Sequence, residues 1–216
     1  MTAPASLPVN RKKPRRKPAA APVALTFPIP AAGETALVGF GNWDTYQMLD
    51  ELIGSRSVRV SYNEGIIEIM SISPLHEKLK TRLGRFLEAY CDHLGRSYEM
   101  LGSATQSQPG RRAAEPDESY AFGAGETDKP DLAIEVALSS GGMDKLSLWA
   151  SLGVLELWIW QNEGLHVFHL QEGRYVPATD SHFLPGFPFH MVAEVLTIKN
   201  GSDAVREFRR RLAEGK

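Results

Sequence analysis

The stretch "KPDLAIEVALSSGGMDK", residues 129–145, places a carboxylate, Glu135, in the middle of an apolar run. Short runs of Leu, Ala, Ile and Val are typical of a strand buried in a sheet. A buried carboxylate without a partner is costly, so it normally shifts its pKa, finds a partner or binds a metal. The stretch therefore predicts a core strand with one carboxylate, and the rest of the sequence has to indicate how that carboxylate is accommodated.

A second strand-like stretch, "EPDESYAFG" at residues 115–123, precedes the first and is joined to it by "AGETDK". If the two strands form a hairpin centred on residue 126, Asp117 lies directly opposite Glu135. Opposite residues share a face of the sheet, with Cβ atoms about 4.5–5.5 Å apart. Two carboxylates at that separation can share a divalent cation, and oxygen ligands favour Mg²⁺ or Mn²⁺.

Asp131 is a weaker candidate for the same ion. It lies on the same face of the expected strand as Glu135, but four residues separate them by about 13 Å. Its position directly after Pro130 favours a local turn or capping role.

Lys145 opens a short expected helix, residues 144–153, ten residues after Glu135. Trp149 follows at i+4, so the lysine stem can lie along an inward face and direct the ammonium into a cleft. Such a lysine can activate a water or stabilise charge on a phosphate. Spacing alone favours an ordinary surface lysine, and the neighbouring Asp144 can also reach the cleft.

The rest of the chain predicts an α/β protein with a mixed central β-sheet, flanked by a long N-terminal helix and by the short helix after the carboxylate strand. A hairpin is expected around "NEG" at 63–65, where glycine supplies a positive φ. Helices are expected at 43–54, 74–94 and 202–212, and further strands at 97–101, 156–161, 164–170 and 174–179.

His76 and Glu77 open the long helix at 74–94. Glu77 is a possible outer metal ligand, but an acidic residue there also favours the positive end of the helix dipole. His76 more simply satisfies local hydrogen bonds at the helix start. The other histidines lack the clustered spacing of a zinc site.

Composition restricts the class of protein. The 216 residues, 43% of them hydrophobic, suffice for one sizeable core, so we expect a single domain at 40–216. Cys91 is the only cysteine, which excludes an internal disulfide and a cysteine zinc site and favours a reducing cytoplasm. No run of about 18 apolar residues predicts a membrane span.

Residues 1–39 are expected to be a disordered basic, Pro- and Ala-rich tail. Residues 1–22 hold six of the 24 basic residues and none of the 26 acidic ones, so the remainder has a formal charge of −8. The tail is either an arm that contacts phosphates or a solubilising leader, and its sequence favours neither.

"EPDESY", "PDLAIEVALSS" and "DKLSLWASLGVLELWIW", in this order, closely resemble the Uma-type restriction endonucleases, a bacterial family of the PD-(D/E)XK nuclease superfamily. The resemblance covers residues 43–198. It implies a restriction-endonuclease-like core with Asp117 and Glu135 as metal-binding acids and Lys145 as the catalytic lysine. The superfamily lysine normally lies two residues after the second acid. That position is Ala137 here, so the resemblance implies a lysine displaced onto the following helix.

The sequence therefore predicts a Mg²⁺- or Mn²⁺-dependent endonuclease that acts on DNA, with Arg111 and Arg112 as candidate phosphate contacts just before Asp117. The alternative is a non-catalytic nucleic-acid-binding or accessory protein on the same fold, which Ala137 favours. A homodimer is plausible by analogy with enzymes that cut both strands.

Overall fold

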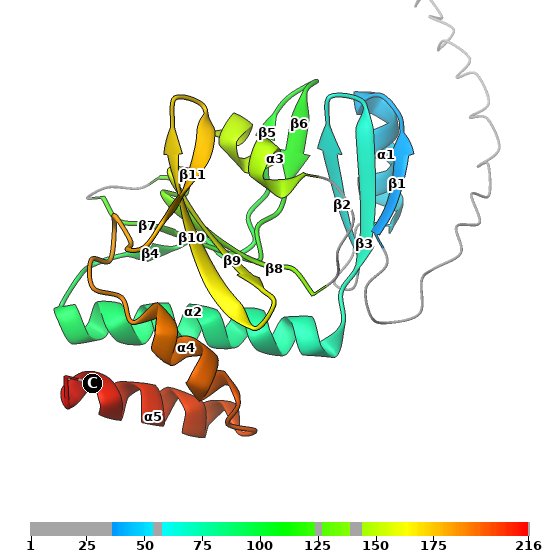
Figure 1. Ribbon diagram of the computed structural model, residues 1–216. Coiled ribbons are helices and arrows are strands. Elements are labelled where there is room, and N and C mark those ends of the chain that lie inside the picture. The colour runs from blue at the N-terminus through cyan, green and yellow to red at the C-terminus, as the bar shows by residue number, and fades with distance from the viewer. Residues whose placement is uncertain (1–35, 54–57, 124–126, 139–143, 216) are drawn as a thin grey trace, which may run out of the picture.

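The computed structural model describes residues 36–53, 58–123, 127–138 and 144–215, which form two sheets and five helices (Figure 1). Residues 1–35, which make up most of the expected basic tail, lie outside the described residues. The five-stranded first sheet is antiparallel. Its strands, in spatial order, are β1 (Ala36–Phe40), β3 (Ile66–Ser71), β2 (Val58–Asn63), β6 (Arg112–Ala114) and β5 (Gln106–Gln108).

The six-stranded second sheet is mixed, as predicted, because β8 and β9 run parallel while the other neighbours are antiparallel. Its strands, in spatial order, are β11 (Arg174–Ala178), β10 (Gly164–Gln171), β9 (Glu156–Gln161), β8 (Leu132–Val136), β7 (Glu118–Ala121) and β4 (Glu99–Met100).

Helices cover both faces of the second sheet. In Figure 1, α2 (Pro74–Leu94) runs along one face, with α4 (Phe189–Leu196) and α5 (Gly201–Ala213) beside it. The large core lies between these helices and alternate strand residues such as Leu132, Ile134 and Trp158. On the opposite face, α3 (Lys145–Leu152) buries Leu148 and Trp149 against Ala133 and Leu157.

The first sheet uses its two faces differently. One face packs against α1 (Trp43–Ile53), where Tyr46 and Leu49 are buried with Val60 and Tyr62. Because side chains alternate along a strand, the neighbouring Arg59 and Ser61 point to the other face. Both are buried despite their polarity. This second face is therefore a polar interior surface.

The pairing register of β7 and β8 agrees with the hairpin predicted from the sequence. Glu118 pairs with Ile134 and Ser119 with Ala133, so the hairpin is centred on residue 126. The next position outward places Asp117 level with Glu135. The β2–β3 turn is also as expected, with positive φ at Glu64 and Gly65.

Other parts of the fold differ from the prediction. Residues 36–39, which the sequence placed in the tail, belong to β1. The short strands β5 and β6 were not expected, and the β2–β3 hairpin belongs to a separate sheet rather than to one central sheet. No helix within the described part of the chain is long and apolar enough to cross a membrane.

Candidate active site

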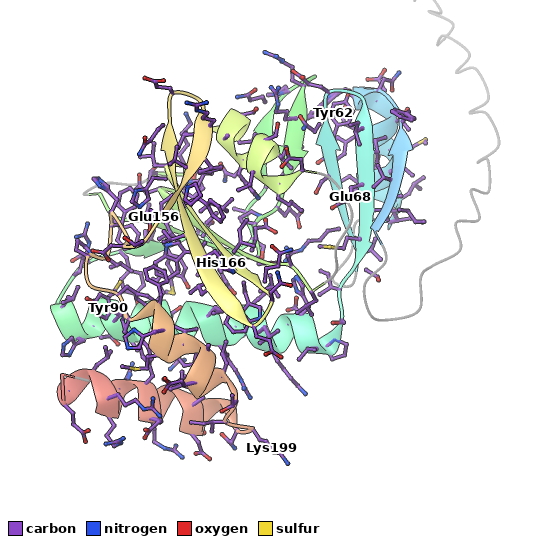
Figure 2. The ribbon with its side chains drawn as sticks, in the orientation of Figure 1. Tyr62, Glu68, Tyr90, Glu156, His166 and Lys199 are labelled. Carbon is purple, nitrogen blue, oxygen red and sulfur yellow. The ribbon has the colours of Figure 1, made fainter. Side chains whose placement is uncertain are left out.

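Six polar side chains from six different segments meet where the first sheet faces the second, and Figure 2 labels one of them, Glu68. The first sheet supplies two of them, α2 and α3 supply one each, and the remaining two come from the β7–β8 hairpin. They are Arg59 on β2, Glu68 on β3, His76 on α2, Asp117 before β7, Glu135 on β8 and Lys145 on α3.

Asp117 is completely buried, and both of its carboxylate oxygens have partners. Oδ1 accepts a hydrogen bond from Arg59 Nη1 at 2.5 Å, and Oδ2 accepts one from the backbone amide of Val136 at 2.7 Å. Burial alone would raise the pKa of Asp117, but His76 and Arg59 together hold it below its usual value. Asp117 is therefore ionised at neutral pH.

His76 is brought to Asp117 by the start of α2. Ser73 caps the helix by accepting a hydrogen bond from the His76 backbone amide at 3.1 Å, and Pro74 occupies the first turn. The imidazole Nε2 then lies 3.2 Å from Asp117 Oδ2. Burial lowers the pKa of His76, but its contact with Asp117 outweighs this and leaves the pKa raised.

Glu135 lies on the α3 side of β8 and is also buried. Its Oε1 accepts a hydrogen bond from the Trp149 indole at 2.8 Å, which fixes the carboxylate beneath α3. Burial and the negative charge of Asp117 raise the pKa of Glu135 to about 7, although Lys145 opposes this change. Glu135 therefore changes from protonated to ionised near neutral pH.

Lys145 places its ammonium between two buried carboxylates. Nζ lies 3.6 Å from Glu68 Oε1 and 4.0 Å from Glu135 Oε2. A cation in the first turn of a helix opposes the dipole, so these acids supply the compensating attraction. Burial lowers the pKa of Lys145, but Glu135 and Glu68 outweigh it and leave the pKa raised. The lysine therefore remains charged beside Glu135.

The secondary candidates lie in three different environments. Asp131 accepts a hydrogen bond from the Phe122 backbone amide at 2.8 Å, so it fastens the end of β7 to the start of β8. Asp144 is exposed and caps α3 through the Ser147 amide. Glu77 is half exposed and lies 3.5 Å from Lys80 Nζ. Of the two residues that open α2, the structure brings His76, rather than Glu77, to Asp117.

Arg111 and Arg112 lie at the start of β6 and converge on one acid. Their guanidinium groups lie 2.7 and 2.6 Å from Glu64 Oε1 in the β2–β3 turn. Arg112 is largely buried and also donates to Asn63 at 3.1 Å, whereas the side chain of Arg111 is 65% exposed. Arg111 is therefore the more accessible of the two.

The chemistry of the carboxylates fits a magnesium-type ion only with help from water or substrate. Asp117 and Glu135 offer oxygen donors from neighbouring strands, as such an ion requires. Among the described residues, no group of three or more His, Cys, Asp or Glu side chains lies close enough to hold a metal ion. Mg²⁺ commonly binds through one or two carboxylates, with waters and substrate phosphates completing its shell.

Sequence reasoning did not include Arg59 and Glu68 in the site. Glu68 stands in "IIEIM", a carboxylate within an apolar strand, which is the same signal that identified Glu135. Arg59 stands between two valines in "SVRVSY" and is only 7% exposed. A charged residue inside an apolar strand was visible at both positions, but no local pattern indicated that this hairpin lies beside β8.

Comparison with known proteins agrees with the arrangement of these segments. The family model Uma2, described as "Putative restriction endonuclease", matches residues 43–197, which include all six site residues. No curated protein matches the chain. The mixed second sheet with α2 and α3 on its two faces forms a restriction-endonuclease-like core. The chain therefore belongs to the Uma2 family of restriction-endonuclease-type proteins.

Proposed function

We propose that this protein is a metal-dependent endonuclease that hydrolyses phosphodiester bonds in DNA. The arrangement of Lys145 carries the proposal, because its ammonium is held within 4.0 Å of Glu135 and 3.6 Å of Glu68 in the interior. Two buried acids beside one lysine exceed the needs of a structural ion pair. Family membership favours the same activity.

Asp117 and Glu135 are the residues that would hold Mg²⁺ or Mn²⁺. When bound, such an ion would polarise a phosphate oxygen and make a bound water easier to deprotonate. A carboxylate must be ionised to bind a metal. Glu135 has a pKa of about 7, so it becomes ionised near neutral pH. Trp149 fixes one of its oxygens and leaves the other facing Lys145.

Lys145 acts as a fixed positive charge in this proposal. Its raised pKa keeps it protonated, so it does not serve as the general base. The Lys145 side chain is only 23% exposed, and a largely shielded ammonium stabilises negative charge that develops on a phosphate more strongly than a fully exposed one, because water screens it less. Its role is therefore to stabilise the transition state and orient the attacking water.

The test is nicking of supercoiled plasmid DNA with Mg²⁺, Mn²⁺ or a chelator. We expect Asp117→Asn, Glu135→Gln and Lys145→Met each to lower the nicking rate by at least about 100-fold. Lys199→Met is the matched control, since Lys199 is exposed in the α4–α5 connection, far from Glu68 (Figure 2). Nicking that persists in the chelator, or in all three site variants, would refute the proposal.

A non-catalytic nucleic-acid-binding protein is the second candidate. It is favoured by the complete pairing of Asp117, whose two oxygens already have protein partners. This alternative expects DNA binding that survives chelation and Asp117→Asn, with no nicking under any condition. Fluorescence anisotropy on labelled duplex, measured beside the plasmid assay, separates the two.

DNA is the proposed partner, and Arg111 is the stronger of the two candidate phosphate contacts because it is exposed. Cleavage of both strands would require a second active site, so a homodimer remains a prediction. Sedimentation of the protein with and without duplex DNA tests it.

A further inference from the structure

Arg59 is a buried cation that the proposed chemistry does not use. It lies on β2 with its side chain on the polar interior face of the first sheet, and it is only 7% exposed. A guanidinium is rarely buried without a matched anion, because loss of hydration costs several kcal/mol. Its partners therefore indicate why it is there.

Within the described residues, the one ion pair of Arg59 is with Asp117. Nη1 donates to Asp117 Oδ1 at 2.5 Å, while Nη2 lies 3.4 Å from Ser103 Oγ. The other oxygen of Asp117 is taken by the Val136 amide and by His76. Oδ1 is thus the oxygen through which Asp117 would bind a metal, and Arg59 occupies it.

We propose that Arg59 is a built-in counter-cation that competes with the divalent metal for Asp117. The inference rests on the proposed function, because it assumes that Asp117 is a metal ligand. Arg59 keeps the buried carboxylate paired when metal is absent, and metal binding requires its guanidinium to withdraw from Oδ1. Arg59 is therefore a positioning residue that sets the affinity of the site for metal.

Electrostatics gives the direction of the effect. A dication at Asp117 stands close to the Arg59 charge in a poorly hydrated interior, where like charges repel more strongly than in water. Arg59 also lowers the pKa of Glu135, so its field reaches both carboxylates. Removing this positive charge should strengthen metal binding, whereas simple damage to the fold would weaken it.

The experiment is calorimetric titration of Mn²⁺ into the wild type, Arg59→Gln and Arg59→Lys. Glutamine keeps an N–H donor for Asp117 without the charge, and lysine keeps the charge. We expect Arg59→Gln to bind Mn²⁺ at least tenfold more tightly than the wild type, and Arg59→Lys to remain within about threefold of it.

Arg112→Gln is the matched control. Arg112 is also a largely buried arginine of the first sheet, but its acidic partner is Glu64 rather than Asp117. Its loss removes the same charge and should leave the Mn²⁺ affinity within twofold. If both variants gained the same Mn²⁺ affinity, the effect would come from net charge alone. That result would overturn the inference that Arg59 competes with the metal at Asp117.

A second measurement titrates the wild type with metal and does not depend on Arg59→Gln, in case that variant does not fold. The guanidinium ¹⁵N–¹H resonance that disappears in Arg59→Lys is followed while Mg²⁺ is added. We expect this resonance to shift or broaden as the metal binds. A resonance that stays in place while calorimetry records binding would overturn the inference.

The outcomes separate this inference from the proposed function. Equal Mn²⁺ affinity in the wild type and Arg59→Gln, with plasmid nicking intact, refutes the competition and leaves the nuclease standing. If neither protein binds Mn²⁺ or nicks DNA, both proposals fail.

Discussion

Two buried carboxylates on neighbouring strands show how partners distinguish a structural acid from a functional one. Glu156 on β9, labelled in Figure 2, is fully buried. It accepts hydrogen bonds from the Trp158 indole, the Ser181 hydroxyl and the His182 amide, all at 2.6–2.7 Å. Glu135 accepts one such bond and faces Lys145. Glu156 is satisfied by its neighbours, whereas Glu135 keeps an oxygen directed toward the site.

The raised pKa of Glu135 predicts a pH-dependent cost to stability. A carboxyl whose pKa rises from 4.5 to about 7 on folding supports the fold fully below pH 4.5 and loses that contribution as pH rises through 7. The shift corresponds to about 3 kcal/mol. Glu135→Gln keeps an acceptor for Trp149 and removes the titration. We expect its stability relative to wild type to increase by about 2 kcal/mol between pH 5 and pH 8.

Urea unfolding at the two pH values, in a chelator, measures this difference. Glu172→Gln in the exposed β10–β11 turn is the control and should show no such change. If the stability of Glu135→Gln relative to wild type is the same at both pH values, Glu135 does not titrate near neutrality. Its proposed role in metal binding near pH 7 would then need another explanation.

Individual residues were predictable from the sequence only where a local pattern identified them. Two strand patterns predicted a hairpin centred on residue 126, which places Asp117 level with Glu135. The pairing register of β7 and β8 has the same centre. Glu68 and Arg59 come from a different sheet, more than 45 residues earlier in the chain. Their approach depends on how the two sheets meet, which local periodicity does not encode.

The long helix α2 shows how an element can hold the site through packing. Ser73 and Gly95 cap its two ends, and its apolar face packs on β7 and β8. Gly84 lies where the helix approaches the Tyr120 hydroxyl. A Cβ at residue 84 would lie 2.7 Å from that oxygen, closer than ordinary contacts permit. Glycine therefore permits the close approach of α2 to the strand that follows Asp117.

Gly84→Ala tests this approach. Alanine favours a helix by about 1 kcal/mol over glycine, so an unhindered position would gain stability. Here Tyr120 is almost fully buried and cannot move freely, so we expect a net loss of about 1–2 kcal/mol. Thermal unfolding measures the change. Tyr120→Phe removes the hydroxyl, so Gly84→Ala made in that background should be neutral or stabilising. If Gly84→Ala remains destabilising there, a clash with the hydroxyl is not the cause.

Elements with strong periodicity were predicted well, and short polar ones were not. The helices α2, α3 and α5 and the strands β8–β11 have clear apolar patterns, and all are present near the expected residues. The strands β5 and β6 are three residues long and consist of "QSQ" and "RAA". Their strand conformation comes from pairing with each other and with β2, rather than from local preference.

Charge is unevenly distributed over the whole molecule. Residues 1–22 hold six basic and no acidic residues, and the remainder has a formal charge of −8. An acidic body disfavours nonspecific contact with DNA phosphates. The family match does not extend to these residues, since it begins at residue 43. A DNA-cleaving role therefore makes the tail the natural source of phosphate contacts.

Binding of a labelled 20-base-pair duplex at several salt concentrations tests the tail. Each phosphate contact contributes about 0.9 to the slope of log affinity against log salt. Replacing the six basic residues with glutamine keeps the tail length and should reduce that slope by about 3–5 units if most of them contact phosphates. A chelator prevents cleavage during the measurement. An unchanged slope would identify the tail as a leader with no part in DNA binding, and the contacts would then have to come from the body, beginning with the exposed Arg111.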